Sequence, residues 1–292
     1  MDLGFVGFGL IGGSIARAVR ANPKTSRWRM TAWTPSGSGP AQALKDRVID
    51  VAATAPEAAV TEADLVILAA PATACLRLID QLVGPWRSQL RPDAVVTDVA
   101  STKARIVERA DAAGLWFVGG HPMAGLETAG YGTSDARLFV DRPWIVIPGA
   151  LAGPSDVARV VDLATACGAR VVEMDATAHD RAVSAVSHLP LVVAAALAEA
   201  VAGTLAAVRD DWPAARALAA GGWRDATRVG HGDPAMGAAI AVTNAAVLAK
   251  RIRDLRSVLD EWLAELERKG GPREGALEKR LADARSILED EP

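Results

Sequence analysis

The stretch LGFVGFGLIGGSIARAV, residues 3–19, decides how the rest of the chain is interpreted. It begins with apolar residues that predict a buried strand and ends with the apolar spacing of a helix. Between the two lies the pattern Gly-x-Gly-x-x-Gly, formed by Gly7, Gly9 and Gly12. The first glycine permits a tight turn, the second leaves room for a pyrophosphate, and the third lets helix and strand pack closely. A strand, a glycine turn and a helix in this order predict a dinucleotide site.

The N–H groups at the start of the predicted helix supply the second half of that site. Those of Leu10, Ile11 and Gly12 have no partner inside the helix, and the helix dipole adds partial positive charge there. Such groups can bind a phosphate. A flexible glycine turn without a ligand is the alternative, but the flanking strand and helix favour the nucleotide site.

The loop after the second predicted strand, residues 29–33, bears on the kind of dinucleotide. NAD sites usually carry an Asp or Glu there, which binds the ribose hydroxyls. This chain has TPSGSG at residues 34–39 instead. No carboxylate in that loop repels a 2′-phosphate, and the hydroxyls of Thr34 and Ser36 can donate hydrogen bonds to one. We therefore expect NADP as the cofactor, and NAD stays possible because the loop has no arginine.

Strand and helix patterns alternate through the first part of the chain. Besides the two strands above, strands are predicted at 64–71, 94–98, 115–118, 144–148 and 170–174, and helices at 44–48, 74–82 and 156–167. This alternation predicts an α/β fold, a Rossmann-type doubly wound parallel sheet in a dinucleotide-binding domain of residues 1–174.

Residues after several predicted strands are expected to share one edge of this sheet. Pro71 ends one strand, and Ser101 and Lys103 lie in the turn after another. Open α/β sheets bind ligands at the carboxyl ends of their strands, beside the glycine loop. We therefore expect Pro71 and Ser101 to contact the cofactor and Lys103 to contact the substrate. The alternative for Ser101 and Lys103 is a helix cap and a solvated side chain.

The segment GGHPMAGLE, residues 119–127, holds one of the four histidines of the chain. It follows the predicted strand 115–118, so His121 is expected in a turn just past the carboxyl end of a parallel strand. The small residues around it allow backbone and ligand to approach closely. A turn whose histidine merely packs is the alternative; the edge shared with the glycine loop favours a place for His121 in the chemistry.

From residue 175 onward, alanine- and leucine-rich stretches predict an all-helical domain of residues 175–292. Helices are predicted at 178–201, 243–267 and 277–288, and the second has apolar residues at spacings of four and three. That stripe is typical of intrachain or dimer packing, and by analogy we expect a homodimer formed through this domain, which also borders the substrate.

Polar residues interrupt the helical half at two places. His179 and His188 lie in an otherwise apolar predicted helix, which Pro190 is expected to kink. The stretch GGWRDATRVGHGDP, residues 221–234, is expected to connect helices and carries two arginines. Arginine can bind a substrate carboxylate through two parallel hydrogen bonds, or form a salt bridge between helices. The sequence leaves the roles of His179 and His231 open.

Composition excludes several classes of protein. The chain has 292 residues, 50% of them hydrophobic and 23% charged, with a net charge of −3, which gives no support for nucleic-acid binding. The longest strongly apolar run, residues 191–198, is too short to span a bilayer. Because the first residues already predict a strand, we expect no signal peptide. Cys75 and Cys167 are expected in the core, not in a disulfide or metal site. We expect a cytoplasmic protein with a small-molecule substrate and no metal.

Five motifs occur in order: the glycine loop, TDVASTK at 97–103, GGHPMAG at 119–125, SHLP at 187–190 and GWRDATRV at 222–229. By these motifs the chain resembles the prephenate/arogenate dehydrogenases of tyrosine biosynthesis, over residues 7–270. The resemblance implies an enzyme that oxidises a cyclohexadienol. Some relatives carry a C-terminal regulatory domain or a chorismate mutase segment; we expect neither here, and therefore expect a monofunctional enzyme. A hydride leaves the hydroxyl-bearing ring carbon for a nicotinamide while the ring carboxylate departs as carbon dioxide.

The same resemblance implies roles for individual side chains. His121 accepts the proton of the substrate hydroxyl, and Ser101 hydrogen-bonds that hydroxyl and the nicotinamide side. Arg228 binds a substrate carboxylate. His188 and Glu127 line and order the pocket.

One position departs from many prephenate-using members of the family. They carry a second histidine three residues after the first in the Ser-His-x-Pro motif, where this chain has Leu191. A leucine cannot donate a hydrogen bond to the keto group of prephenate. Members with an aliphatic residue there tend to accept arogenate, so we expect arogenate with NADP.

Two other functions remain open at this point. One is a two-domain NADP-dependent reductase of the β-hydroxyacid dehydrogenase or imine reductase type, which would use a lysine or aspartate of the helical domain. The other is a catalytically inert NADP-sensing dimer. Turnover with a cyclohexadienol distinguishes both from a dehydrogenase of tyrosine biosynthesis.

Overall fold

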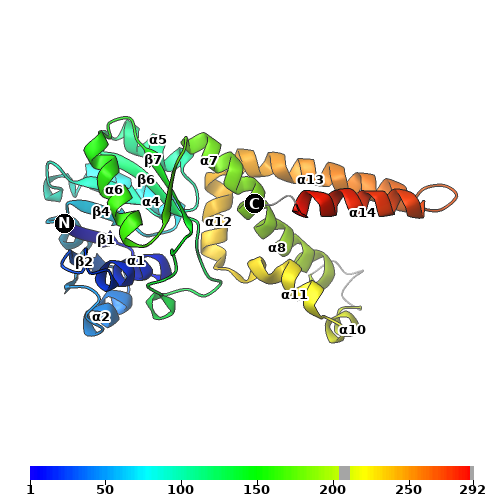
Figure 1. Cartoon of the computed structure of the whole chain (residues 1–292), viewed down its shortest axis with the longest axis horizontal. Helices are drawn as coiled ribbons and strands as arrows, with labels where there is room; N and C mark the ends of the chain where they lie inside the picture. The colour runs from blue at the N-terminus through cyan, green and yellow to red at the C-terminus, as the bar shows by residue number, and fades with distance from the viewer. Residues whose placement is uncertain (204–210, 290–292) are drawn as a thin grey trace. The chain divides into compact units, whose positions relative to one another are not determined.

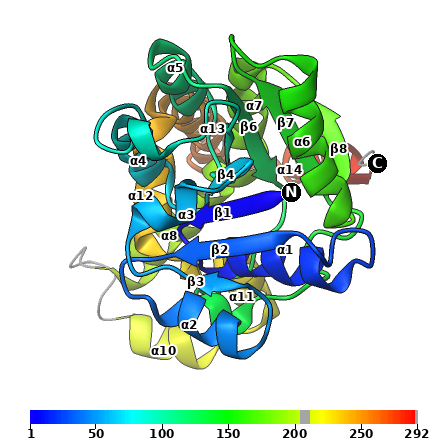
Figure 2. The same ribbon diagram turned by 90° about the vertical axis from the view of Figure 1, so that its left-hand side faces the viewer.

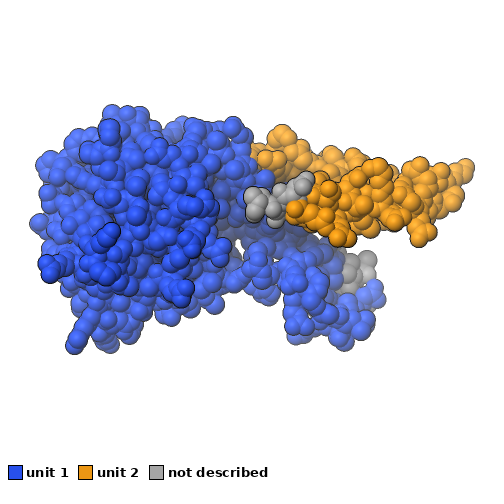
Figure 3. All heavy atoms as spheres, viewed as in Figure 1, with its two compact units in different colours: residues 1–245 blue, residues 246–292 orange. Residues whose placement is uncertain are grey.

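The computed structural model describes residues 1–203 and 211–289 and divides into two compact units (Figures 1 and 3). The first unit comprises residues 1–245 and the second residues 246–292. The predicted domain boundary after residue 174 lies inside the first unit, where the last strand gives way to helices.

The first unit is built on one sheet of eight strands in the order β3-β2-β1-β4-β5-β6-β7-β8. The strands are β1 (Asp2–Val6), β2 (Arg29–Trp33), β3 (Val51–Ala52), β4 (Leu65–Leu68), β5 (Val95–Asp98), β6 (Phe117–Pro122), β7 (Pro143–Pro148) and β8 (Arg170–Glu173). The predicted doubly wound sheet is therefore confirmed, and its order reverses between β1 and β4, where such sheets bind dinucleotides.

The prediction of a wholly parallel sheet is wrong at one pairing. Strand β7 runs antiparallel to β6, and β8 runs parallel to β7. A parallel pair needs a crossover connection, usually a helix. The segment between β6 and β7 holds only the short 3-10 helix η2 (Tyr131–Thr133), so the chain returns beside β6 in the opposite direction.

Helices cover both faces of the sheet, as Figure 2 shows. They are α1 (Leu10–Ala21), α2 (Ser38–Lys45), α3 (Pro56–Val60), α4 (Ala72–Val83), α5 (Ala104–Ala112) and α6 (Pro154–Ala166). Along β4 the side chains alternate: Leu65 and Ile67 join the apolar cluster under α1 and α6, while Val66 and Leu68 join the one under α4 and α5. Burial on both faces explains why this strand is apolar at every position.

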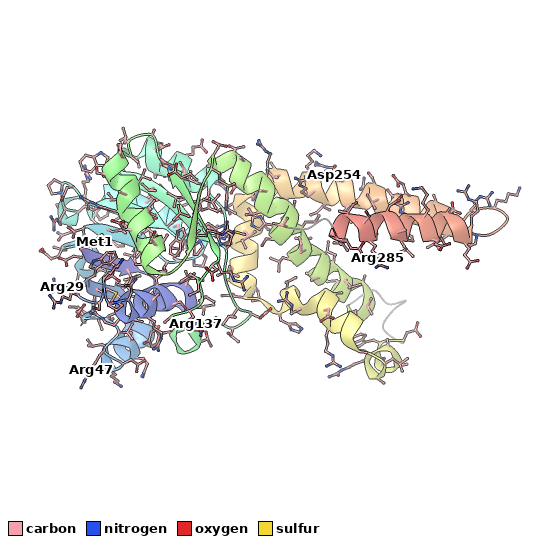
Figure 4. The ribbon with its side chains drawn as sticks, viewed as in Figure 1. Met1, Arg29, Arg47, Arg137, Asp254 and Arg285 are labelled. Atoms are coloured by element: carbon pink, nitrogen blue, oxygen red, sulfur yellow. The ribbon has the colours of Figure 1, made fainter. Side chains whose placement is uncertain are left out.

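The helix predicted at residues 44–48 lies earlier in the chain, as α2 (Ser38–Lys45). Arg47 ends it, because its φ of 57° places it in the left-handed region (Figure 4). The N–H of Val48 then donates to the carbonyl of Ala43 at 2.9 Å. Val48 is buried although it lies beyond the end of the helix. In the sequence, this apolar residue therefore resembles one on the buried face of a helix, which explains why the helix was predicted too late in the chain.

The helices after β8 begin with one continuous helix, residues 176–202. It comprises α7 (Ala176–Val183), a π-helical turn η3 (Ser184–His188) and α8 (Leu189–Ala202). Pro190 lies two residues after this π-helical turn, and the irregular hydrogen bonding of the turn accommodates its missing N–H. The irregularity that the sequence predicted as a kink thus takes the form of a π-helical turn. Further helices among the described residues of this unit are α10 (Trp212–Ala217), α11 (Gly221–Thr227), η4 (Arg228–His231) and α12 (Pro234–Thr243), and a short 3-10 helix, η1 (Arg87–Gln89), precedes β5. The expected connection at residues 221–234 is thus largely helical.

The helix Ala176–Ala202 also corrects the expectation that no apolar run could span a bilayer. It has 27 residues and a mean hydropathy of 1.8, enough in length and composition to cross a membrane. A single such helix is weak support for a membrane span, because apolar helices of soluble proteins pass the same test. Its apolar surface is equally suited to packing against another protein chain.

The second unit is a pair of helices, α13 (Ala245–Leu266) and α14 (Glu274–Glu289). Arg273 binds both carboxylate oxygens of Glu265, and Arg280 lies 5.0 Å from the ring centre of Trp262. The helix predicted at residues 277–288 is confirmed, since these residues lie within α14. Several large apolar side chains of this unit are exposed: Leu259, Leu263, Leu266, Leu281, Ile287 and Leu288.

Candidate functional site

The glycine loop lies at the point where the strand order reverses. Gly7 has a φ of 95°, and a Cβ built on it would lie 2.3 Å from the carbonyl oxygen of Ala69, just after β4. At Gly9 an added Cβ meets no atom within 4 Å. Gly9 is also the N-cap of α1 and brings no side chain to the free N–H groups of that helix. The loop therefore offers open space in front of a helix N-terminus, which fits the pyrophosphate of a dinucleotide.

The residues predicted beside the adenosine ribose form a small hydroxyl cluster at the end of β2. Thr34 Oγ1 accepts the N–H of Gly37 at 3.1 Å, and the hydroxyls of Ser36 and Ser38 are 2.9 Å apart. Ser36 and Ser38 are exposed, and this loop carries no carboxylate. The cluster can donate hydrogen bonds to a phosphate or to ribose hydroxyls.

Two other predicted cofactor residues follow neighbouring strands of the sheet. Pro71 is exposed and begins α4, shortly after β4, and Ser101 is half-buried after β5. Strands β4 and β5 pair in parallel, so both residues follow the carboxyl ends of adjacent strands, as the sequence predicted.

Lys103 is placed differently from its predicted solvated or substrate-binding position. Its side chain is fully buried, and its ammonium group forms an ion pair with Asp98 and donates to the carbonyl of Gly120 at 2.7 Å. Asp98 also accepts the backbone N–H groups of Ala100 and Gly120. Lys103 thus has no exposed atom to offer a substrate, and it fixes the end of β5 against β6. The predicted contact between Lys103 and the substrate is therefore wrong.

His121 lies within a strand, and not in a turn after one. Strand β6 extends to Pro122 because β7 pairs with it antiparallel, which places His121 opposite Ile145. The side chain is 8% exposed. The backbone of His121 is therefore fixed by strand pairing, which is firmer support than a loop gives.

A chain of three buried side chains starts at His121. Its Nδ1 is 2.8 Å from Nε2 of His179, whose Nδ1 is 2.8 Å from Oδ1 of Asp180. Burial lowers the pKa of His121 well below its usual value, and the nearby His179, Lys103 and His188 lower it further. The ring of His121 is therefore neutral at neutral pH and can accept a proton.

His188 lies in the π-helical turn and meets a different partner. Asn244 Nδ2 donates to the carbonyl of Asp180 at 2.9 Å, which identifies this atom as the amide nitrogen, and it lies 3.2 Å from Nδ1 of His188. That amide group can only donate, so Nδ1 of His188 accepts and Nε2 carries the hydrogen. Nε2 is buried, and it forms no hydrogen bond of ideal geometry among the described residues. Burial lowers the pKa of His188 to about 4, although a contact with the backbone of Ser101 raises it in part, so the ring is neutral at neutral pH.

Arg228 and Glu127 form an ion pair with each other. Glu127 follows β6 in an exposed loop, and Arg228 begins η4. Hydrogen bonding to its own backbone N–H and to Arg228 lowers the pKa of Glu127, which is therefore ionised at neutral pH. Because Arg228 and Glu127 are 63% and 40% exposed, solvent screens the pair, and an anionic ligand can compete for the arginine.

Some residues of this region were given no role by the sequence. The sequence left the role of His179 open and gave none to Asp180 or Asn244. The adjacent His-Asp pair was the available signal. His231 is exposed in η4. Across residues 1–203 and 211–289, no group of three or more His, Cys, Asp or Glu side chains is arranged to hold a metal ion.

Two family models match consecutive parts of the chain. Residues 15–173 match the nucleotide-binding domain of prephenate dehydrogenase, and residues 175–278 match the dimerization domain of prephenate dehydrogenase. The prephenate dehydrogenase of Bacillus subtilis (strain 168) is 34% identical over 265 residues, which cover 90% of this chain and 67% of the relative.

Solved structures show the same similarity. The arogenate dehydrogenase of Synechocystis is 30% identical with a TM-score of 0.77, and the match covers 99% of this chain and 100% of the other. The prephenate dehydrogenase of A. aeolicus, solved with hydroxyphenyl propionate and NAD+, is 26% identical with a TM-score of 0.85. That match covers 100% of this chain and 98% of the other.

Proposed function

Because the chain belongs to the prephenate dehydrogenase family, we propose that it oxidatively decarboxylates arogenate or prephenate in tyrosine biosynthesis, with arogenate and NADP preferred. It is an NAD(P)-dependent oxidoreductase of this family. In the proposed division of labour, residues 1–174 bind the dinucleotide and residues 175–292 border the substrate and form a homodimer. We expect the enzyme to act in the cytoplasm.

The position of His121 is the observation that carries this proposal. Its ring is buried, neutral and held in a strand at the side of the sheet where the glycine loop lies. A neutral imidazole can take the proton of a substrate hydroxyl as the carbon–hydrogen bond beside it breaks. The nicotinamide, when bound, accepts the hydride. Ser101, which follows the neighbouring strand β5, is proposed to hydrogen-bond the same hydroxyl.

Charged and polar groups of the helical part can hold the substrate anion. Arg228 can exchange its exposed partner Glu127 for a substrate carboxylate, which it would bind through two parallel hydrogen bonds. His188, neutral and buried next to the backbone of Ser101, is proposed to line the substrate site. The negative charge of the substrate repels Glu127, which favours its separation from Arg228, and Glu127 is proposed to order the loop beside the bound substrate.

The substrate preference rests on Leu191. Its side chain is half-buried, and its Cδ2 would lie 3.5 Å from a Cβ added to Gly237 of α12. An aliphatic side chain there gives no hydrogen bond to the keto group of prephenate, so the site does not favour prephenate over the amino-acid side chain of arogenate. The solved relatives include an arogenate and a prephenate dehydrogenase, and both substrates are compatible with the family.

The cofactor preference rests on the hydroxyl cluster of Thr34, Ser36 and Ser38. A 2′-phosphate placed there meets donors and no carboxylate. The dimer proposal rests on the matched dimerization domain and on the exposed leucines of α13 and α14, which another copy of the chain can bury.

Steady-state turnover with each of four pairings tests the function: arogenate or prephenate, each with NADP+ or NAD+. We expect reduced cofactor and carbon dioxide in equal amounts, with the highest kcat/KM for arogenate and NADP+. Reduction of NADP+ with a β-hydroxy acid instead of a cyclohexadienol would support the reductase alternative. Cofactor binding without turnover in any pairing would support the inert sensor.

A further inference from the structure

The side chains of His179 and Asp180 lie behind His121 in a hydrogen-bonded series. This arrangement suggests a role for them beyond filling the protein core. His121, His179 and Asp180 form two consecutive hydrogen bonds of 2.8 Å, and His179 has no exposed surface. The rings of His121 and His179 meet at 77°, with their centres 5.0 Å apart. This is an edge-on arrangement, in which a nitrogen of one ring can donate in the direction of the lone pair of the other.

Asp180 determines which ring nitrogens carry hydrogens in this series of side chains. The carboxylate accepts the backbone N–H groups of Lys103 at 2.7 Å and Ala104 at 2.9 Å, at the start of α5. Burial alone raises the pKa of Asp180, but hydrogen bonds from His179, Ala104 and Lys103 outweigh it and hold the pKa below its usual value. Asp180 is therefore an ionised acceptor, and Nδ1 of His179 must donate to it.

The proton on one nitrogen of His179 determines the role of the other. A neutral His179 that donates from Nδ1 has a lone pair on Nε2, and this lone pair accepts a hydrogen from Nδ1 of His121. His121 then has its own lone pair on Nε2. The opposite arrangement, with a hydrogen on Nε2 of His179, would place one on Nε2 of His121 and leave it unable to accept a proton there.

We propose that His179 and Asp180 are positioning residues that hold the hydrogen of His121 on Nδ1, so that Nε2 is the proton acceptor. This inference rests on the proposed function, since it assigns the atom that performs the step. The substrate O–H bond breaks, its proton goes to Nε2 of His121, and its electron pair forms the carbonyl bond as the hydride leaves for the nicotinamide. The resulting imidazolium keeps donating from Nδ1 to His179, behind which lies the negative charge of Asp180.

The place of His179 and Asp180 on α7 lets the two side chains face different elements. Neighbouring residues of a helix point about 100° apart, so His179 can face β6 while Asp180 faces the start of α5. Asn244 holds the backbone of Asp180 from α12. The groups that act electrostatically on His121 are His179 from α7, Lys103 from the turn after β5, and His188 from the π-helical turn.

Nitrogen-15 NMR of the histidine rings, in the wild-type protein with NADP+ bound, tests the proposal without any variant except His121→Asn for assignment. We expect Nδ1 of His121 to carry the hydrogen and Nε2 to have the chemical shift of a free lone pair. A wild-type ring with its hydrogen on Nε2 overturns the proposal. This readout needs no turnover, so it stays interpretable if the proposed function fails.

Kinetics of two matched variants provide the second test. His179→Gln keeps an acceptor oxygen for Nδ1 of His121, and His179→Leu does not. By analogy with tautomer loss in other histidine-carboxylate sites, we expect His179→Leu to lower kcat at least about 100-fold with little change in KM. His179→Gln should stay within about tenfold of the wild type. Equal loss in both variants, with NADP+ affinity intact, would mean that the histidine only fills space and would overturn the proposal.

Discussion

The contrast between Gly7 and Gly9 gives a sharp prediction about the glycine loop. A Cβ at Gly7 would stand 2.3 Å from the carbonyl oxygen and 2.7 Å from the carbonyl carbon of Ala69, both backbone atoms that cannot move aside cheaply. The φ of 95° at Gly7 is also unfavourable for any residue with a side chain. At Gly9, φ is −101° and an added Cβ meets nothing within 4 Å.

The two substitutions should therefore separate folding from cofactor binding. A side chain in a left-handed conformation costs about 1–2 kcal/mol, and overpacking costs about 1–3 kcal/mol. We expect Gly7→Ala to lower the free energy of unfolding by at least about 2 kcal/mol. Gly9→Ala should cost at most about 1 kcal/mol, because alanine is a poorer N-cap than glycine. It should weaken dinucleotide binding at least about tenfold, because its methyl group occupies the space left for the pyrophosphate.

Urea denaturation and fluorescence titration with NADP+ measure these two quantities on both variants. The reasoning is refuted if Gly7→Ala unfolds at the wild-type urea concentration. It is equally refuted if Gly9→Ala binds NADP+ as tightly as the wild type does.

Four other outcomes follow from the structure. Lys103→Met leaves Asp98 buried without its ion-pair partner and should lower the free energy of unfolding by about 3–5 kcal/mol at neutral pH, measured by urea denaturation. Adding Asp98→Asn to the same chain should restore part of the lost stability. An unchanged stability in Lys103→Met would contradict the buried ion pair. The pKa of His188 in the folded protein is lowered from 6.5 to about 4, so the unfolded chain binds more protons between pH 4 and pH 6.5. The free energy of unfolding should therefore fall as the pH decreases from 6.5 to 4, and His188→Leu should make it depend less on pH over this range. Ser36→Asp should lower the preference for NADP+ over NAD+ in kcat/KM at least about tenfold, because a carboxylate repels the 2′-phosphate; an unchanged ratio would place the phosphate elsewhere. Leu191→His should raise kcat/KM for prephenate relative to arogenate about tenfold, the value of one hydrogen bond, and a ratio that does not move would remove Leu191 from the specificity argument.

The periodic parts of the chain were predictable, and the direction of one strand was not. Buried strands with apolar residues at every position, such as Leu65–Leu68, and the glycine pattern at Gly7, Gly9 and Gly12 require a doubly wound sheet. The reversal of β7 depends on a connection that lacks a helix, and its sequence has no pattern that states the strand direction. The predicted turn around His121 failed for the same reason, because antiparallel pairing with β7 extends β6 by several residues.

The site was predictable residue by residue only where a local motif carried the chemistry. Lys103 was misjudged because lysine is rarely buried, and its partner Asp98 lies five residues earlier on the preceding strand. The link from His121 to His179 joins residues 58 positions apart, and no spacing rule reveals such a contact. The register of α7 against β6 brings them together, and this register is a property of the folded packing.

The most direct test of the central claim is single-turnover reduction of NADP+ by His121→Asn with arogenate. An asparagine cannot take up the hydroxyl proton, and general-base catalysis by a positioned side chain contributes about 100- to 10,000-fold in rate. We predict a loss of that size in the rate of cofactor reduction, with the dissociation constant for NADP+ unchanged. Reduction at the wild-type rate would contradict the account, because His121 would then not be the proton acceptor.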